Sequence, residues 1–296
     1  MKQPANLKAV RGHSERSVLI VGDITHRDFA PALGWLQHHA RVAWAPGITA
    51  ACDRLETRTP PQVLLLAQAR PGRFSRDQIE QLHARAPLAR LVVLLGSWCE
   101  GETRTGHPWP GVPRIFWHQW QCRLAIELAA SQTGWSTWQL PRTASASDVL
   151  EETTTAPWPH GQGLVVIHAR QWVDFEGLSD ACRAGGYATL WQPPNRPAFC
   201  SGATAVLFNG RGGDPDEADS VAELVTAYRP APVIPLLDFL RYDDSQRMGR
   251  AGASTPLAKP FLVRDLLWTL QQSIHHPRGA GGECTGPQPR QASGSA

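Results

Sequence analysis

The sequence predicts an α/β fold in which two doubly wound, five-stranded parallel sheets follow each other along the chain. Three observations support this fold class. Short and nearly continuous apolar runs, typical of strands buried on both faces, alternate with amphipathic stretches of helical period. The alternation stops near the middle of the chain and then begins again. The length of 296 residues exceeds the usual size of a single domain.

The first half, residues 17–131, contains the complete alternation of a doubly wound domain. Ser75 has the residue type of an N-cap and opens one of its helices. Parallel strands joined by right-handed crossovers place helices on both faces of the sheet. The predicted strands are residues 17–22, 41–45, 62–67, 90–95 and 114–117, and the predicted helices cover 27–39, 48–57, the segment from Ser75, and a closing segment that includes Leu124, Ile126 and Leu128.

A linker of residues 132–162 is predicted because this segment is rich in Ser, Thr, Ala and Pro and has no sustained apolar period. The second domain, residues 163–276, restarts the alternation. Three prolines within 193–202 predict that its second helix is shortened or lost. The predicted strands are residues 163–168, 187–191, 203–208 and 232–237, and the predicted helices are 172–184, 214–228 and 261–274.

The two ends of the chain and its composition limit the possible functions. Residues 1–16 and 277–296 have few apolar groups, so both ends are expected to be disordered. The 29 basic and 26 acidic residues are nearly balanced and spread along the chain, which argues against a nucleic-acid partner. No apolar run is long enough to span a membrane, and none of the six cysteines forms a C-x-x-C pair. A cytoplasmic protein with free thiols is expected.

The string Leu257-Ala-Lys-Pro-Phe261 near the end of the second half resembles the end of a response-regulator receiver domain (CheY-like). In that family a Lys-Pro-Phe sequence leaves the fifth strand and enters the fifth helix. A second feature of that family is a Pro-Gly turn after the third strand, and Arg70-Pro71-Gly72 matches it. The order of elements extends the resemblance over most of both halves.

Internal spacing supports a duplicated module. The end of the fourth strand and the position of the receiver lysine are 22 residues apart in both halves, from Gly96 to His118 and from Leu237 to Lys259. The ends of the third and fourth strands are separated by 29 residues in one half and by 28 in the other. Two halves with matching spacing indicate a tandem repeat of one fold.

The resemblance implies five functional positions in each half. A working receiver has an acid pair after strand one for Mg²⁺ and an Asp after strand three that accepts the phosphoryl group. A Ser or Thr after strand four and a Lys after strand five then contact the phosphate. The residues at these positions are Gly22, Asp23, Ala67, Gly96 (with Ser97 next to it) and His118 in the first half, and His168, Ala169, Asn209, Leu237 and Lys259 in the second.

Neither half keeps the carboxylate that would accept phosphate. Ala67 has no nucleophile, and Asn209 has the shape of Asp without its charge. Asp23 alone is too few carboxylates for Mg²⁺. Lys259 remains, but a lone Lys at a strand end commonly covers that end with its stem. The sequence therefore predicts no catalytic residue, no cofactor and no metal ion.

The loop of residues 97–120 is the most unusual stretch and replaces the expected fourth helix of the first half. It lies at the carboxyl ends of strands four and five, the edge at which open α/β sheets bind ligands. An aromatic loop packed on its own domain or on a partner is the favoured interpretation, because no standard ligand spacing occurs. The residues that would form a small-molecule or metal site under the alternative are Cys99, Glu100, Glu102, His107 and His118.

The sequence thus predicts a non-catalytic tandem of pseudo-receivers that is not phosphorylated. It would act as a scaffold or regulatory module in bacterial-type, two-component signalling, through a protein partner or self-association. The glycines in Gly210-Arg-Gly-Gly-Asp214 are expected to form a turn and not a phosphate cradle, since the P-loop and dinucleotide spacings are absent. The alternative function is a small-molecule or metal-binding domain, possibly an enzyme, that uses the 97–120 loop.

Overall fold

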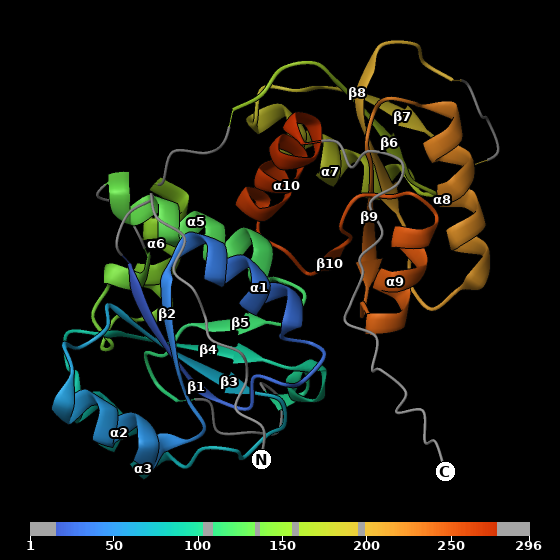
Figure 1. Cartoon of the computed structure of the whole chain (residues 1–296). Helices are drawn as coiled ribbons and strands as arrows, with labels where there is room; N and C mark the ends of the chain where they lie inside the picture. Colours follow the sequence, from blue (N-terminus) through green and yellow to red (C-terminus); the bar gives the residue numbers. More distant parts are fainter. Residues whose placement is uncertain (1–15, 103–108, 134–136, 156–159, 195–198, 277–296) are drawn as a thin grey trace, which may run out of the picture. The chain divides into compact units, whose positions relative to one another are not determined.

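The computed structural model describes residues 16–102, 109–133, 137–155, 160–194 and 199–276. The chain divides into two compact units, one formed by Met1–Trp158 with Leu240–Tyr242 and the other by Pro159–Phe239 with Asp243–Ala296. Each unit contains one five-stranded sheet (Figure 1). The two predicted disordered ends lie almost entirely outside the described residues.

The first sheet is entirely parallel and has the strand order β2-β1-β3-β4-β5. This is the flavodoxin-like order 2-1-3-4-5 of doubly wound proteins. The elements are β1 (Ser17–Gly22), α1 (Ala30–His39), β2 (Arg41–Ala45), α2 (Ile48–Thr57), β3 (Val63–Gln68), α3 (Arg76–Arg85), β4 (Arg90–Leu95), η1 (Ser97–Cys99), β5 (Arg114–Phe116) and α5 (Trp120–Thr133).

Two apolar layers hold the helices on this sheet. Alternate side chains of the strands face α2 and α3 on one side and α1 and α5 on the other. Figure 1 shows these two pairs of helices on opposite faces of the sheet. The central strand β3 is buried along its whole length, in agreement with its unbroken apolar run. Ser75 caps α3 as expected, because its Oγ accepts from the Gln78 amide and the Gln78 side chain accepts from the Ser75 amide.

The second sheet repeats the same topology with the order β7-β6-β8-β9-β10. All of its neighbouring strands are parallel. Helices α7 and α10 cover one face, and α8 and α9 lie on the other (Figure 1). The elements are β6 (Leu164–His168), α7 (Trp172–Ala184), β7 (Ala188–Gln192), β8 (Ala203–Asn209), α8 (Pro215–Ala227), β9 (Val233–Asp238), α9 (Tyr242–Arg250), β10 (Leu257–Lys259) and α10 (Val263–His275). The predicted fold class is therefore confirmed.

Three segments differ from a simple repeat of the domain. The described residues between β7 and β8 contain no helix, as the prolines predicted. Helix α9 was not predicted, because only Met248 gives it a large buried apolar side chain. The segment 132–162, expected to be a linker without regular structure, contains the 3-10 turn η2 (Thr137–Gln139) and helix α6 (Ala146–Thr155). Trp138 from this segment packs into the core of the first domain.

The described helices are too short or too polar to cross a lipid bilayer.

Candidate functional site

The receiver positions of the first domain meet at the carboxyl edge of the first sheet. Gly22 and Ala67 are partners in the register of β1 and β3, while Gly96 directly follows β4. Ala67 is 1 % exposed and belongs to the apolar layer under α1 and α5. Ala67, the predicted acceptor position, is therefore a buried methyl group.

Gly22 closes the same position from the neighbouring strand. Its φ is +120°, a conformation that residues with a side chain rarely adopt. A Cβ at residue 22 would lie 2.6 Å from the backbone oxygen of Ala67. An acidic side chain at residue 22 would therefore require the local backbone to rearrange.

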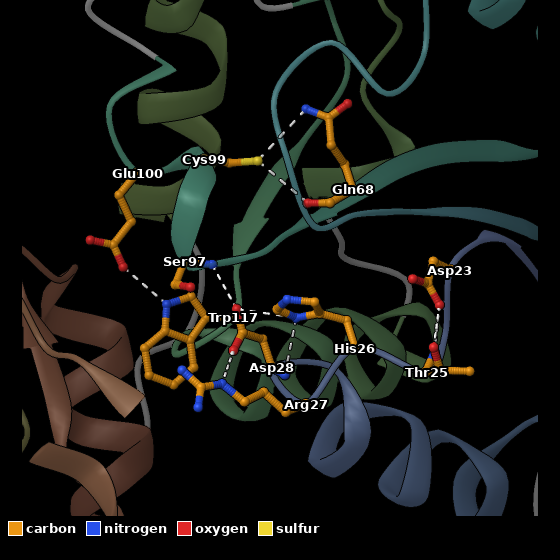
Figure 2. Close-up of polar contacts among 10 residues, drawn as sticks. All are labelled: Asp23, Thr25, His26, Arg27, Asp28, Gln68, Ser97, Cys99, Glu100 and Trp117. Carbon is orange, nitrogen blue, oxygen red and sulfur yellow. Dashed lines mark hydrogen bonds and ion pairs between the residues drawn. The ribbon is translucent and has the colours of Figure 1, made fainter. Parts of the chain in front are cut away.

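Asp23 forms a turn with Thr25. Its Oδ1 accepts from the Thr25 amide at 2.9 Å and from the Thr25 hydroxyl at 2.6 Å, as Figure 2 shows. These two hydrogen bonds lower the pKa of Asp23. Asp23 stabilises the loop after β1 in this way, an Asx-turn arrangement.

Asp28 is a buried carboxylate that sequence analysis missed. Its Oδ2 accepts from the Ser97 amide at 2.8 Å and lies 3.5 Å from His26 Nδ1, while its Oδ1 lies 3.9 Å from Arg27 Nε (Figure 2). The side chain thus joins the loop after β1 to the turn after β4. The sequence does place an acidic residue directly before the helix that begins near Phe29. Its partner Ser97 is 69 positions away, so the local sequence pattern could not predict the contact.

Two of the predicted loop residues, Cys99 and Glu102, pack around Gln68. Cys99 Sγ donates to the Gln68 carbonyl at 3.4 Å, and Gln68 Nε2 donates to Glu102 Oε1 at 3.1 Å. Arg114 also pairs with Glu102 at 3.2 Å. Burial raises the pKa of the Cys99 thiol to about 11. The cavity beside this group has a volume of about 10 Å³, which is room for roughly one water molecule.

Glu100 and His118 form a separate pair. Glu100 Oε1 accepts from Trp117 Nε1 at 2.9 Å and lies 3.9 Å from His118 Nε2. Burial lowers the pKa of His118 to about 4, so its ring is neutral at pH 7. Burial also raises the pKa of Glu100. His107, the remaining predicted loop residue, lies outside the described residues.

The structure therefore separates the predicted loop residues into two groups. Over the described parts of the chain, no cluster of three or more His, Cys, Asp or Glu side chains could hold a metal ion.

The receiver positions of the second domain centre on Lys259. Its Nζ donates to Asn209 Oδ1 and to the Gly210 carbonyl, each at 2.9 Å, and it pairs with Asp238 Oδ1 at 2.9 Å. Asn209 Nδ2 in turn donates to Asp174 Oδ2 at 3.0 Å. The three protons of the ammonium group thus face three acceptors within the domain.

The remaining positions of this edge are apolar or aromatic. Ala169 and Leu237 are fully buried. His168 stacks on Phe208 with a distance of 5.4 Å between the ring centroids. Burial lowers the pKa of His168 and favours the neutral ring. None of these side chains offers a carboxylate for a hard cation.

The backbone amides of the glycine-rich turn after β8 are hydrogen-bonded to the carboxylate of Glu217. Gly212 and Gly213 have φ near +77°, as expected for a turn. The carboxylate of Glu217 accepts from the Arg211 amide at 2.7 Å and from the Gly212 amide at 2.9 Å. Because Glu217 already uses these backbone donors, the turn is not open to a phosphate group.

Comparisons with known proteins identify similar folds. No protein-family model matches the chain, and no curated protein matches it in sequence. Solved structures that resemble it include a response regulator receiver protein from Pseudoalteromonas atlantica, 18 % identical with a TM-score of 0.34 over 38 % of this chain and 97 % of that one. A response regulator receiver domain protein from Clostridium thermocellum is 15 % identical, with a TM-score of 0.34 over 38 % of this chain and 94 % of that one.

A third similar structure extends over both domains. It is a probable two-component system response regulator/GGDEF domain protein, 16 % identical with a TM-score of 0.33, and the match covers 88 % of this chain and 100 % of that one. With TM-scores of this size, the fold class rests on the strand order in each sheet. The structural neighbours of the chain include response-regulator receiver proteins, and both of its sheets have the 2-1-3-4-5 strand order that CheY also has.

Proposed function

We propose that the chain is a tandem of receiver-like domains that takes part in signalling through protein association and does not accept a phosphoryl group. The observation that carries this proposal is the state of the two acceptor positions. Ala67 is a buried methyl group beside Gly22, and the Asn209 amide is held between Lys259 and Asp174. A neutral amide is a poor nucleophile and a weak ligand for Mg²⁺.

Support for this proposal also comes from the charges around Lys259. In a receiver this lysine contacts the phosphoryl group, whereas here Asp238 and two backbone or amide oxygens surround it. A phosphoryl group would have to displace these acceptors. It would also need a metal ion to balance its charge, at an edge where residues 168 and 169 supply no acid.

Phosphorylation is tested on the full chain with acetyl phosphate and Mg²⁺, followed by intact mass measurement. The expected result is no mass increase for the wild type. Asn209→Asp is the matched variant: it restores a carboxylate at the predicted acceptor but leaves residues 168 and 169 without an acid, so it should also remain unmodified. A phosphorylated wild-type chain would refute the proposal.

Association is tested by light scattering coupled to size-exclusion chromatography over a range of protein concentrations. Exposed large apolar side chains support association, among them Trp98, Trp172 and Phe199, which are 67 %, 52 % and 63 % exposed. The expected result is a mass above the 32.4 kDa of one chain that rises with concentration. A monomer at every concentration would remove self-association from the proposal.

A cytoplasmic location belongs to the same proposal. The five cysteines in the described part of the chain are free thiols, the state expected in a reducing compartment. Fractionation of cells that produce the chain tests this point. The alternative of a ligand held by Cys99 and Glu102 gains no support from the described residues, because the cavity beside them holds roughly one water molecule.

A further inference from the structure

The described residues of the second domain differ from the first domain in the segment that follows the second strand. In the first domain α2 follows β2 and packs against the sheet, whereas the described residues between β7 and β8 form no helix. Helix α7 covers the other face of β7, where Ser179 contacts Thr189 and Phe175 stacks on Trp191. Leu190 points away from α7 because side chains alternate along a strand, and it is 38 % exposed.

His168 and Phe208 belong to the same face of the sheet as Leu190. His168 pairs in register with Gln192, two residues beyond Leu190, and also with Phe208 on β8. Paired residues of neighbouring parallel strands share a face. Strands β6 and β8 are also the first and third strands of the module, between which the winding direction of the crossovers reverses. In open α/β sheets this switch point is where ligands bind.

A pocket of about 380 Å³ lies on this face, and we name it the β8 pocket. Its volume is in the usual range for small-molecule sites. Apolar and aromatic contact comes from His168, Phe208 and Pro194. The polar groups that line the pocket are Arg170, Asn209, Asp216, Glu217 and Ser220. The pocket is thus lined by ring-containing side chains and by charged groups of both signs.

Arg170 and Asp216 are the charged groups available to a ligand. Neither side chain forms a hydrogen bond or ion pair that the structure records among the described residues, whereas Glu217 in the same pocket is used by two backbone amides. A guanidinium group binds carboxylates well, and an exposed carboxylate binds ammonium groups. The pocket is therefore matched to a zwitterion that also has an apolar part.

We propose that the β8 pocket binds a free α-amino acid with an apolar side chain. The ligand carboxylate pairs with Arg170, its ammonium group pairs with Asp216, and its side chain packs against Phe208 and Pro194. The neutral ring of His168 adds apolar surface without a competing charge. This inference goes beyond the proposed function, because a chain that is never phosphorylated can bind or fail to bind such a ligand.

The first experiment titrates the full chain with L-phenylalanine and L-leucine by isothermal titration calorimetry. Two analogues of phenylalanine each lack one charge: 3-phenylpropanoate has no ammonium group, and 2-phenylethylamine has no carboxylate. Saturable binding of an amino acid is expected, with each analogue weaker by about 10-fold or more. No saturable binding of either amino acid up to about 10 mM, or binding of both analogues as tight as that of phenylalanine, overturns the proposal.

The second experiment uses charge-neutral variants with matched controls. Arg170→Gln and Asp216→Asn are each expected to weaken amino-acid binding by about 10-fold. Arg183→Gln on α7 and Asp219→Asn on α8 remove the same charges from exposed positions outside the pocket and should leave binding unchanged. Wild-type affinity in both pocket variants, or an equal loss in the controls, overturns the proposal. The acetyl phosphate result is independent of every one of these outcomes.

Discussion

Lys259 Nζ lies 2.9 Å from Asn209 Oδ1, so the side chains at two predicted receiver positions of the second domain are hydrogen-bonded to each other. The same ammonium group pairs with Asp238, so its positive charge is balanced within the domain. The contact joins the ends of β8 and β10 with the end of β9 between them. It therefore stabilises the carboxyl edge of the second sheet.

Lys259→Met should lower the free energy of unfolding of the second domain. The substitution keeps the apolar stem and removes the charged donor to Asn209 and Gly210. Hydrogen bonds to charged groups contribute more than neutral ones, and partial exposure of Lys259 reduces the effect, so a loss of about 1 to 2 kcal/mol is expected. Urea unfolding measures the loss. Arg183→Met, at an exposed position of α7, is the control, and an equal loss in both variants would contradict this interpretation.

Gly22→Ala should destabilise the first domain by about 2 kcal/mol or more, because the backbone is at positive φ and the new Cβ would meet the Ala67 oxygen. Gly34→Ala is the matched control. Gly34 lies within α1, and a Cβ there has nothing within 4 Å, so helix propensity predicts a gain of about 0.5 to 1 kcal/mol. Chemical denaturation of both variants should give opposite signs, and a stable Gly22→Ala variant would show that the edge can rearrange.

The alternating apolar runs predicted parallel, doubly wound sheets and located every strand of the first domain, and the Ser75 cap was predicted from its residue type. In the second domain they located four strands, whereas β10 was expected only from the resemblance of Leu257-Ala-Lys-Pro-Phe261 to the end of a receiver domain. Helix α9 was missed because its residues are mostly charged, and only tertiary packing buries Asp244 and Met248. Helix α6 was missed because Asp148 to Thr155 has no regular apolar period. Local sequence patterns carry little information about such helices, which depend on the surface they cover.

The site was harder to predict than the fold. Ala67 and Asn209 could be placed at the ends of β3 and β8 from the sequence, because apolar runs locate the ends of strands well. The Asp28–Ser97 hydrogen bond and the Gln68–Glu102 pair each join residues more than 30 positions apart. Nothing in either local pattern specifies its partner, so these contacts required the three-dimensional arrangement of the loops.

His118 should make the first domain less stable in acid. The folded protein holds the pKa of His118 at about 4, against 6.5 for the free side chain, because burial disfavours the charged ring. The stabilisation is complete above pH 6.5 and is lost as the pH falls toward 4, since the unfolded chain then binds the extra proton. The contribution over this window is up to about 3 kcal/mol.

The measurement compares urea unfolding of the wild type and His118→Gln from about pH 7 to about pH 4. The variant should show a shallower loss of stability in acid, because glutamine does not titrate. His38→Asn, at an exposed position of α1, should follow the wild-type curve. Parallel pH profiles for the wild type and His118→Gln would contradict the assignment.

Thiol reactivity should separate the buried cysteines from Cys200. The thiolate is the form that reacts with iodoacetamide, and burial raises the pKa of Cys99 to about 11 and that of Cys182 to about 12. Both are fully buried, whereas Cys200 is partly exposed. Near neutral pH, peptide mapping should find Cys200 alkylated before Cys99 and Cys182, which stay protected until denaturant unfolds the domains. Equal rates for Cys99 and Cys200 in the folded chain would show that the turn after β4 opens readily, and that its packing on Gln68 does not persist in solution.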